Sequence, residues 1–169
     1  MNTALLIIDV QQSLVDEGIW EFERVIERLN QLIAKARKEQ VPIVLVRDTR
    51  VEPDGGFHLA LDREPYDIEI VKRFCNSFLE TGLDEILRSK NIGRLVVGGL
   101  QSDFCVDTTC RQAAALGYDV LLLADAHSTL DHEYLKAELI VAHHNRILRN
   151  FDSAQGRVRV SETEKVSFK

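Results

Sequence analysis

The sequence predicts an α/β protein, with a six-stranded, mainly parallel sheet in the strand order 3-2-1-4-5-6 and helices on both faces in a three-layer α/β/α arrangement. Two observations predict this fold. Short apolar runs rich in β-branched residues recur along the chain, which is typical of strands buried on both faces of a parallel sheet. Amphipathic helical patterns separate these runs, so right-handed crossovers are expected between strands. No linker, repeat or low-complexity segment interrupts the alternation, and residues 1–169 are expected to form a single domain.

The elements follow in order along the chain. The first strand is expected at residues 4–8 (ALLII), and later strands at 42–46, 68–71, 95–97, 120–123 and 158–160. The first helix has a charged face opposite an apolar face made of Phe22, Val25, Ile26, Leu29, Leu32, Ile33 and Ala36. Further helices are expected at residues 83–90, 104–116 and 133–149. Gly117 provides a C-terminal cap for the helix before it.

Composition and charge limit the classes of function. The chain is 45% hydrophobic and 28% charged, as ordinary globular proteins are, and its formal net charge of -6 argues against nucleic acid as a partner. The apolar start at residues 4–8 is too short for a signal peptide or a membrane span, so we expect a cytoplasmic protein without a membrane partner. Three cysteines without a C-x-x-C pair indicate free thiols rather than a disulfide framework or a zinc ribbon.

Chemically active side chains gather where the predicted sheet would bind a ligand. In this strand order, sites form at the carboxyl ends of strands 1 and 4, where the winding direction reverses. The first strand ends at Asp9, and the fourth runs into GGLQSDFC, which places Cys105 in the first turn of a helix. Ser102 or Asp103 is the expected N-cap, and the helix dipole predicts a Cys105 pKa below the usual value of about 8.5.

A base and a cation are expected beside this thiol. Asp9 faces Cys105 across the switch point and is the natural proton acceptor. Lys72 ends the third strand, and its ammonium would stabilise a carboxylate or thiolate by about 4 kcal/mol at a separation of about 4 Å. Cys110, deeper in the helix, is expected to pack in the core, and Cys75 has no evident base.

Three segments in this order resemble the isochorismatase-like cysteine hydrolases, a family that includes nicotinamidases, N-carbamoylsarcosine amidases and streptothricin hydrolases. They are ALLIIDVQQSLV, VKRFCNSFLETGL and GGLQSDFCVDTTCRQAAALGYDVLLLADA, and the resemblance spans nearly the whole chain. It implies a catalytic triad of Asp9, Lys72 and Cys105. It also implies a cis peptide between Leu100 and Gln101, with the backbone N–H groups of Gln101 and Cys105 forming an oxyanion hole. The implied reaction is hydrolysis of an amide-type C–N bond of a small molecule through a thioester, by a homo-oligomer that is a dimer or larger.

Departures from the family pattern narrow the range of expected substrates. Nicotinamidases of this family bind a metal through an Asp-x-His segment after strand 2 and a further His, whereas here Thr49 and Arg50 follow Asp48 and only His58 lies near. We therefore expect no metal, no cofactor and a substrate other than nicotinamide. Hydrolysis of a vinyl ether, the alternative reaction, is disfavoured because the family members that perform it do not depend on a cysteine. The segments DAHSTLD and AHHN resemble relatives of streptothricin hydrolase and favour a larger amide.

The pocket walls and two histidines complete the expectations. Gln11, Trp20 and Phe104 are candidate substrate-binding residues by their place in the chain, and the long segment 49–67 is expected to cover the site or contact another subunit. His143 and His144 lack the i, i+4 spacing of metal ligands and are expected to pack, hydrogen-bonded, on the inner side of their helix.

Two readings of another class remain. A nucleotide-binding module is disfavoured because neither G-x-G-x-x-G nor a P-loop occurs. A non-enzymatic interaction protein on the same scaffold stays open, since fold does not determine function. Rapid alkylation of Cys105 near neutral pH favours the enzyme, and a sluggish thiol favours the scaffold.

Overall fold

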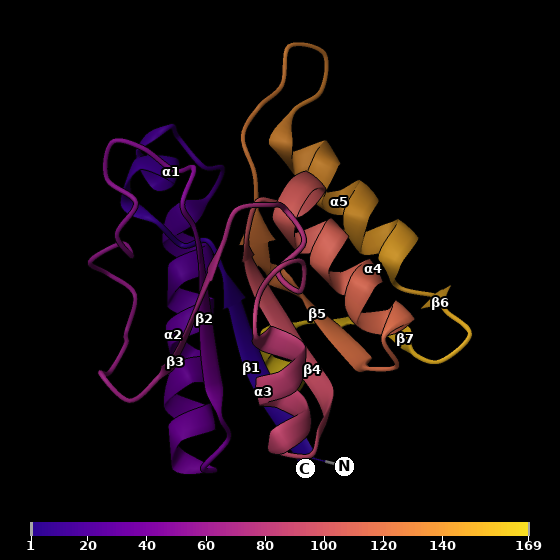
Figure 1. The fold of residues 1–169 in the computed structure, drawn as a ribbon. Helices are drawn as coiled ribbons and strands as arrows, with labels where there is room; N and C mark the ends of the chain where they lie inside the picture. The colour runs from indigo at the N-terminus through magenta and orange to yellow at the C-terminus, as the bar shows by residue number, and fades with distance from the viewer. Residues whose placement is uncertain (1, 169) are drawn as a thin grey trace.

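A seven-stranded sheet forms the centre of the computed structural model, which describes residues 2–168 (Figure 1). Its order is β3-β2-β1-β4-β5-β7-β6. The parallel strands are β1 (Asn2–Ile8), β2 (Ile43–Asp48), β3 (Ile68–Lys72), β4 (Ile92–Leu100), β5 (Asp119–Ser128) and β7 (Arg157–Ser161). These are the six predicted strands in the predicted order, which is confirmed. The additional β6 (Phe151–Asp152) pairs antiparallel with β7 and is too short to give a sequence pattern.

Helices cover both faces of the sheet (Figure 1). The long α2 (Phe22–Lys38) packs on one face, while α3 (Leu83–Ser89), α4 (Asp107–Ala115) and α5 (Ala137–Leu148) lie on the other. Three short helices complete the chain: α1 (Gln12–Asp16), the π-helical turn η1 (Ser102–Val106) and the 3-10 turn η2 (Thr163–Lys165). Among residues 2–168, none of the helices combines the length and apolar character needed to cross a membrane.

Two predicted helices begin differently in the structure. The helix expected at residues 104–116 starts as η1 and becomes α-helical only at Asp107. The helix expected at 133–149 starts at Ala137, because the Asp131 carboxylate accepts the Ala137 backbone N–H at 2.9 Å and the Lys136 ammonium at 2.7 Å. Asp131 thus satisfies a backbone N–H of the first turn from outside the helix, and the helix begins at that residue.

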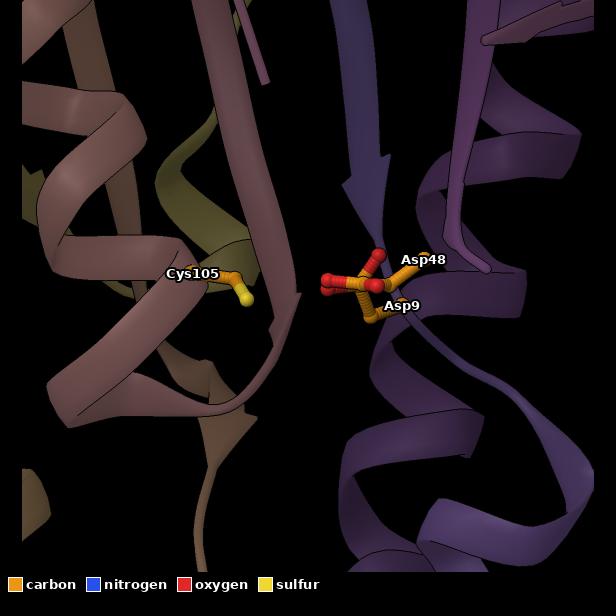
Figure 2. A group of neighbouring side chains, drawn as sticks. All are labelled: Asp9, Asp48 and Cys105. Atoms are coloured by element: carbon orange, nitrogen blue, oxygen red, sulfur yellow. The ribbon is translucent and has the colours of Figure 1, made fainter. Parts of the chain in front are cut away.

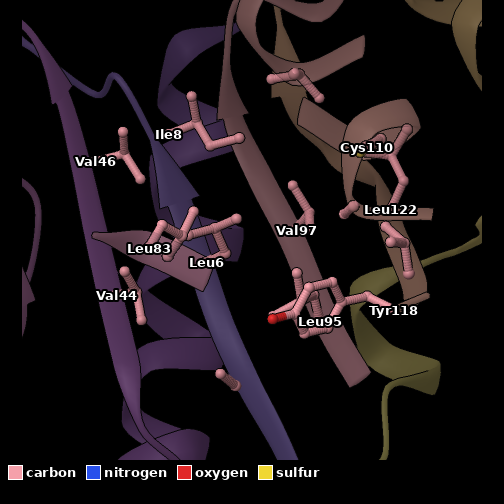
Figure 3. Close-up of a cluster of buried hydrophobic side chains, with 14 of the residues drawn as sticks. Leu6, Ile8, Val44, Val46, Leu83, Leu95, Val97, Cys110, Tyr118 and Leu122 are labelled. Carbon is pink, nitrogen blue, oxygen red and sulfur yellow. The ribbon is translucent and has the colours of Figure 1, made fainter. Parts of the chain in front are cut away.

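Alternate residues of the central strand β1 pack into two separate hydrophobic cores, one on each face of the sheet. Leu5 and Ile7 of β1 pack with α2, whereas Leu6 and Ile8 pack with α3 and α4 (Figure 3). Side chains along a strand point to opposite faces, so a strand covered on both sides needs apolar residues throughout. Each fully buried large aliphatic side chain stabilises the fold by about 1.5–3 kcal/mol.

A glycine lets the two site-bearing strands approach closely. Gly99 of β4 has φ +117°, and a Cβ there would lie 2.1 Å from the backbone oxygen of Ile8 in β1. No other residue type fits this contact without displacing the backbone. The carboxyl ends of β1 and β4 therefore meet at the point where Asp9 and η1 leave the sheet.

Candidate active site

Asp9, Lys72 and Cys105 lie together at the carboxyl ends of the strands. The Lys72 Nζ is 2.7 Å from Asp9 Oδ2 and 3.2 Å from Cys105 Sγ. A third neighbour, Asp48, places its Oδ2 2.8 Å from the same nitrogen. The Lys72 side chain is fully buried, so its three N–H donors are directed at two carboxylates and one sulfur. The three side chains that sequence reasoning selected thus form one contact group.

The positions of these side chains follow from the sheet. Asp48 ends β2 and Lys72 ends β3, and the two residues are partners in the parallel register of these strands. Asp9 follows β1 and has φ +51°, which turns the chain as it leaves the strand. Figure 2 shows the Cys105 thiol, carried by η1, pointing across to the carboxylates of Asp9 and Asp48. Strand ends on one edge of a parallel sheet converge in this way.

A further link holds the loop after β3 against the helix that follows Cys105. The Ser77 backbone N–H donates to Thr109 Oγ1 at 3.1 Å, and the two hydroxyls lie 2.9 Å apart. Thr81 donates its hydroxyl to the Ser77 carbonyl at 2.6 Å. These motif residues fasten the segment beyond Lys72 to α4, so their role in the structure is to join two parts of the site.

Asp48 is a site residue that sequence reasoning considered only as a metal ligand. Besides Lys72, it binds Arg50, whose Nε and Nη2 donate to the two Asp48 oxygens at 2.9 and 2.6 Å. Burial acts to raise the Asp48 pKa, but the hydrogen bonds from Arg50 and Lys72 hold that pKa well below its ordinary value. Its place at the end of β2, matching Asp9 and Lys72 at theirs, is the signal that would have identified it.

Burial controls the protonation of the other groups. It raises the pKa of the Asp9 carboxyl from 3.8 to about 6, against the lowering effect of Lys72. Burial and the negative charge of Asp9 raise the pKa of the Cys105 thiol. Burial alone lowers the Lys72 pKa, but the neighbouring charges of Asp9 and Cys105 raise it overall. Near neutral pH the site therefore holds an Asp9 carboxylate, a Lys72 ammonium and a neutral thiol.

The predicted acidic thiol is consequently wrong, and so is the predicted N-cap. Cys105 is only 8% exposed and lies beside the Asp9 carboxylate, and these two effects raise its pKa although the Lys72 ammonium acts to lower it. Gln101 precedes η1 without a side-chain cap bond. The Ser102 hydroxyl pairs instead with His127, and the Asp103 carboxylate accepts the Thr129 hydroxyl at 2.6 Å.

The acidic and thiol groups of the site have the composition of a metal site. One oxygen each of Asp9 and Asp48 and the Cys105 sulfur all lie within 4.8 Å of one another. The Lys72 ammonium, however, contacts all three side chains at 2.7–3.2 Å and supplies the positive charge that they surround. The carboxylate oxygens of Asp9 and Asp48 and the Cys105 sulfur are thus arranged around the lysine ammonium, which suits them better as a cation than a metal ion does.

A cavity of about 260 Å³ opens onto these groups. It is lined by Asp9, Leu14, Asp48, Arg50, Val51, Cys75, Gln101, Phe104 and Cys105. The peptide bond between Leu100 and Gln101 is cis. Asp9 Oδ1 is buried, and the Asp9 side chain is a hydrogen-bonding partner of the Cys105 thiol. The cavity thus brings the Cys105 sulfur and the carboxylates of Asp9 and Asp48 to one space with largely apolar walls.

The candidate pocket residues separate into two groups. Phe104 lines the cavity and is 45% exposed. Gln11 is fully buried, and its amide binds the Asp48 backbone N–H and carbonyl at 2.7 and 2.9 Å, so it braces β2 and does not line the cavity. Trp20 is also absent from the lining; its ring lies against Arg24.

The segment 49–67 covers the cavity only at its start, through Arg50 and Val51. Phe57 is buried in the core beside α2, and His58 packs edge-on against Phe22 with ring centroids 4.8 Å apart. The apolar side chain of Phe57 thus holds the middle of the segment against the α2 side of the sheet rather than over the thiol.

The remaining thiols and histidines lie partly as expected. Cys110 is fully buried in the core, which confirms its packing role, and Cys75 is half-buried at the cavity wall. His143 is exposed, so the predicted inner position is wrong for it, whereas half-buried His144 bonds the Ile140 carbonyl at 2.8 Å. The buried histidine is His127, on β5. Helical azimuth alone did not show which side faces the sheet.

Comparisons with known proteins identify the family and the fold of the chain. A family model described as the isochorismatase domain matches residues 3–149. Streptothricin hydrolase of Streptomyces noursei is 33% identical over 138 residues, which cover 76% of this chain and 50% of that protein. The chain therefore spans about half the length of this relative. The isochorismatase family protein YrdC of Bacillus subtilis is 31% identical over 134 residues, covering 73% of this chain and 72% of that one.

A more distant relative and a solved structure complete the comparison. A probable inactive nicotinamidase of Arabidopsis thaliana is 24% identical over 170 residues, covering 82% of this chain and 87% of that protein. The crystal structure of an isochorismatase family protein matches with a TM-score of 0.86 and 31% identity, covering 95% of this chain and 98% of that one. This neighbour confirms the predicted fold.

Proposed function

Since the chain belongs to the isochorismatase family of hydrolases, we propose that it hydrolyses an amide-type C–N bond of a small molecule, with Cys105 as nucleophile, Asp9 as proton acceptor and Lys72 as their fixed cation. The observation that carries the proposal is the Lys72 ammonium, buried and within 3.2 Å of both Asp9 Oδ2 and Cys105 Sγ. A thiol and a base oriented by a third group form the usual arrangement of an activated nucleophile.

Charge balance supports a direct proton transfer. Asp9 and Asp48 are negative, and Lys72 and Arg50 are positive, so the four groups sum to zero while the thiol is neutral. Ionising Cys105 beside a charged Asp9 would place two negative charges together, at about 4 kcal/mol for a separation of about 4 Å. Moving the proton from sulfur to Asp9 avoids this repulsion because the total charge of the group stays unchanged.

The proposed reaction has two halves. Cys105 Sγ attacks the substrate carbonyl carbon while its proton passes to Asp9, and the carbonyl electron pair becomes an oxyanion held by the backbone N–H groups of Gln101 and Cys105. The C–N bond then breaks, Asp9 returns the proton to the leaving nitrogen, and a thioester remains. Water next attacks the thioester, giving one proton to Asp9; the C–S bond breaks, the carboxylic acid leaves, and the proton returns to sulfur.

The substrate proposal rests on the cavity. Its apolar walls, formed by Leu14, Val51 and Phe104, favour an uncharged or weakly polar group beside the scissile carbonyl. We place no metal or cofactor in the reaction and regard nicotinamide as a poor substrate. The similarity to streptothricin hydrolase favours an amide whose remaining part extends beyond the cavity.

The experiment is a hydrolysis screen of primary amides, carbamoyl amines, lactams, nicotinamide and a vinyl ether, with wild type and Cys105→Ala. Cys110→Ala is the matched control, because that thiol is buried in the core away from the cavity. We expect release of amine or ammonia by wild type and Cys110→Ala only. Full turnover by Cys105→Ala, or hydrolysis of the vinyl ether alone, would sink the proposal. Inactivity of all three proteins on every substrate favours the non-enzymatic alternative.

We also propose that the protein works in a reducing compartment such as the cytoplasm, because its cysteines are free thiols.

We further propose that the protein forms a homo-oligomer through α5. Leu139 and Ile147 are 56% and 38% exposed and lie two turns apart on one face of α5. Glu138 and Arg146 lie beside them, so an antiparallel second copy sets unlike charges opposite each other. Sedimentation of wild type as a dimer or larger and of Leu139→Asp as a monomer is expected; a monomeric wild type contradicts the proposal.

A further inference from the structure

A buried chain of hydrogen bonds runs behind residues 101–106, which we call the nucleophile turn. The Ser102 hydroxyl lies 2.7 Å from Nδ1 of His127, and Nε2 of His127 lies 3.0 Å from Oδ1 of Asn145. The Asn145 amide nitrogen donates to the Ala124 carbonyl at 2.9 Å. Ser102 and His127 are completely buried. The chain thus connects the nucleophile turn to β5 and α5.

The bonding pattern fixes the direction of every donor. Because the Asn145 amide nitrogen donates to the Ala124 carbonyl, the Asn145 Oδ1 accepts a hydrogen bond from the N–H of His127 Nε2. The other ring nitrogen, Nδ1, is then an acceptor for the Ser102 hydroxyl. Burial lowers the pKa of His127 to about 4, which keeps the ring neutral at physiological pH.

This chain does not form a second reactive centre. Ser102 and His127 are 0% exposed, and neither lines the cavity beside Cys105. Buried polar groups cost free energy unless every one is bonded, and apolar residues would fill the same space without that requirement. A second hydrogen bond lies next to this hydrogen-bonded series: the Thr129 hydroxyl donates to the Asp103 carboxylate at 2.6 Å. Two consecutive residues of the nucleophile turn are therefore attached to the end of β5.

We infer that Ser102 and His127 are positioning residues, which hold the nucleophile turn so that Cys105 Sγ and the Gln101 backbone stay aligned on the cavity. Ser102 follows Gln101 directly and precedes Cys105 by three residues within η1. The hydrogen bond between Ser102 and His127 holds the turn in place. Asn145 contributes by fixing the His127 tautomer whose Nδ1 accepts the Ser102 hydroxyl. The inference rests on the proposed function, because alignment is useful only if Cys105 attacks a substrate.

Two substitutions of His127 separate this role from simple packing. Asparagine places an amide oxygen near the position of Nδ1 and keeps an acceptor for Ser102, whereas glutamine places its amide near Nε2 and keeps only the contact with Asn145. Both replacement side chains are polar, and neither extends further than the histidine ring. His127→Asn is therefore the conservative rescue, and His127→Gln is the test.

We expect Ser102→Ala and His127→Gln to lower kcat about 10- to 100-fold with KM within about threefold of wild type, as loss of alignment does. His127→Asn should keep kcat within about threefold. The double variant Ser102→Ala/His127→Gln should be no slower than the slower single variant, because both remove one shared link. Equal losses in His127→Asn and His127→Gln, or a loss that follows the fall in Tm, overturn the inference.

Alkylation of Cys105 by iodoacetamide, followed by peptide mass spectrometry, gives a readout that needs no substrate. The thiol must pass its proton to Asp9, so a displaced turn should slow alkylation at least about fivefold in His127→Gln but not in His127→Asn. Unchanged or faster alkylation in His127→Gln contradicts the inference. If wild type hydrolyses nothing in the screen while this difference holds, the proposed reaction fails and the positioning role stands.

Discussion

Asp48 and Lys72 are register partners on adjacent parallel strands, and their side chains meet at 2.8 Å within the candidate active site. This contact anchors the ammonium that also holds Asp9 and Cys105. Arg50 covers the outer side of Asp48, so the carboxylate lies between two cations. The site is thus built as an alternating row of charges across the strand ends.

Replacing Asp48 by asparagine should move the acid limb of kcat/KM to lower pH. The negative charge of Asp48 contributes to the raised pKa of Asp9, so its removal makes the Asp9 carboxylate easier to ionise. We also expect kcat to fall about tenfold, because Lys72 loses one of its anchors. The pH–rate profile checks the shift, and a limb that stays in place or moves to higher pH contradicts it.

Asp9→Asn should be inactive yet more stable than wild type at pH 7.5. The folded-state pKa of Asp9 is raised from 3.8 to about 6, so the folded protein binds a proton more tightly than the unfolded chain. That contribution is complete below about pH 4, and up to about 3 kcal/mol is lost as pH rises through 6. Asparagine removes this loss. Urea unfolding at pH 4 and 7.5 tests it: the advantage of Asp9→Asn should grow with pH, and a constant difference rules it out.

Chelation should leave turnover unchanged. The Lys72 ammonium already lies within 3.2 Å of each group that would ligate a metal. Prolonged dialysis against EDTA is therefore expected to keep kcat within experimental error, whereas added Zn²⁺ should inhibit by displacing the thiol proton and binding the Cys105 sulfur. Loss of activity on dialysis, with recovery on adding a divalent metal, would show that the assignment of Lys72 as the cation is wrong.

Phe104→Leu and Trp20→Leu should differ in their effect on substrate binding. Phe104 lines the cavity, whereas Trp20 lies outside it against Arg24. We expect KM to rise about 3- to 30-fold in Phe104→Leu and to stay within about twofold in Trp20→Leu, since only one ring meets the substrate. Steady-state kinetics on the best substrate from the screen decide this, and equal KM values in the two variants contradict it.

The sequence by itself determined the strand order and the place of the site. Short runs that are apolar on both faces are typical of buried parallel strands, whose carboxyl ends share one edge of the sheet, and Asp9, Lys72 and Cys105 were selected as site candidates from their positions at these ends. Local patterns also placed Cys110 in the core. These conclusions depend on periodicity along the chain, which a sequence displays directly.

Only the tertiary structure decided the chemistry within the site. Three features depend on residues 25 or more positions apart in the chain. They are the effect of Asp9 on the Cys105 pKa, the hydrogen bonds from Gln11 to Asp48 and the hydrogen bond between Ser102 and His127. Electrostatic and hydrogen-bond energies depend on distances of a few ångströms and on exclusion of water, and neither quantity has a local signature in the chain. Helix position predicted an acidic thiol, and burial beside Asp9 reversed it.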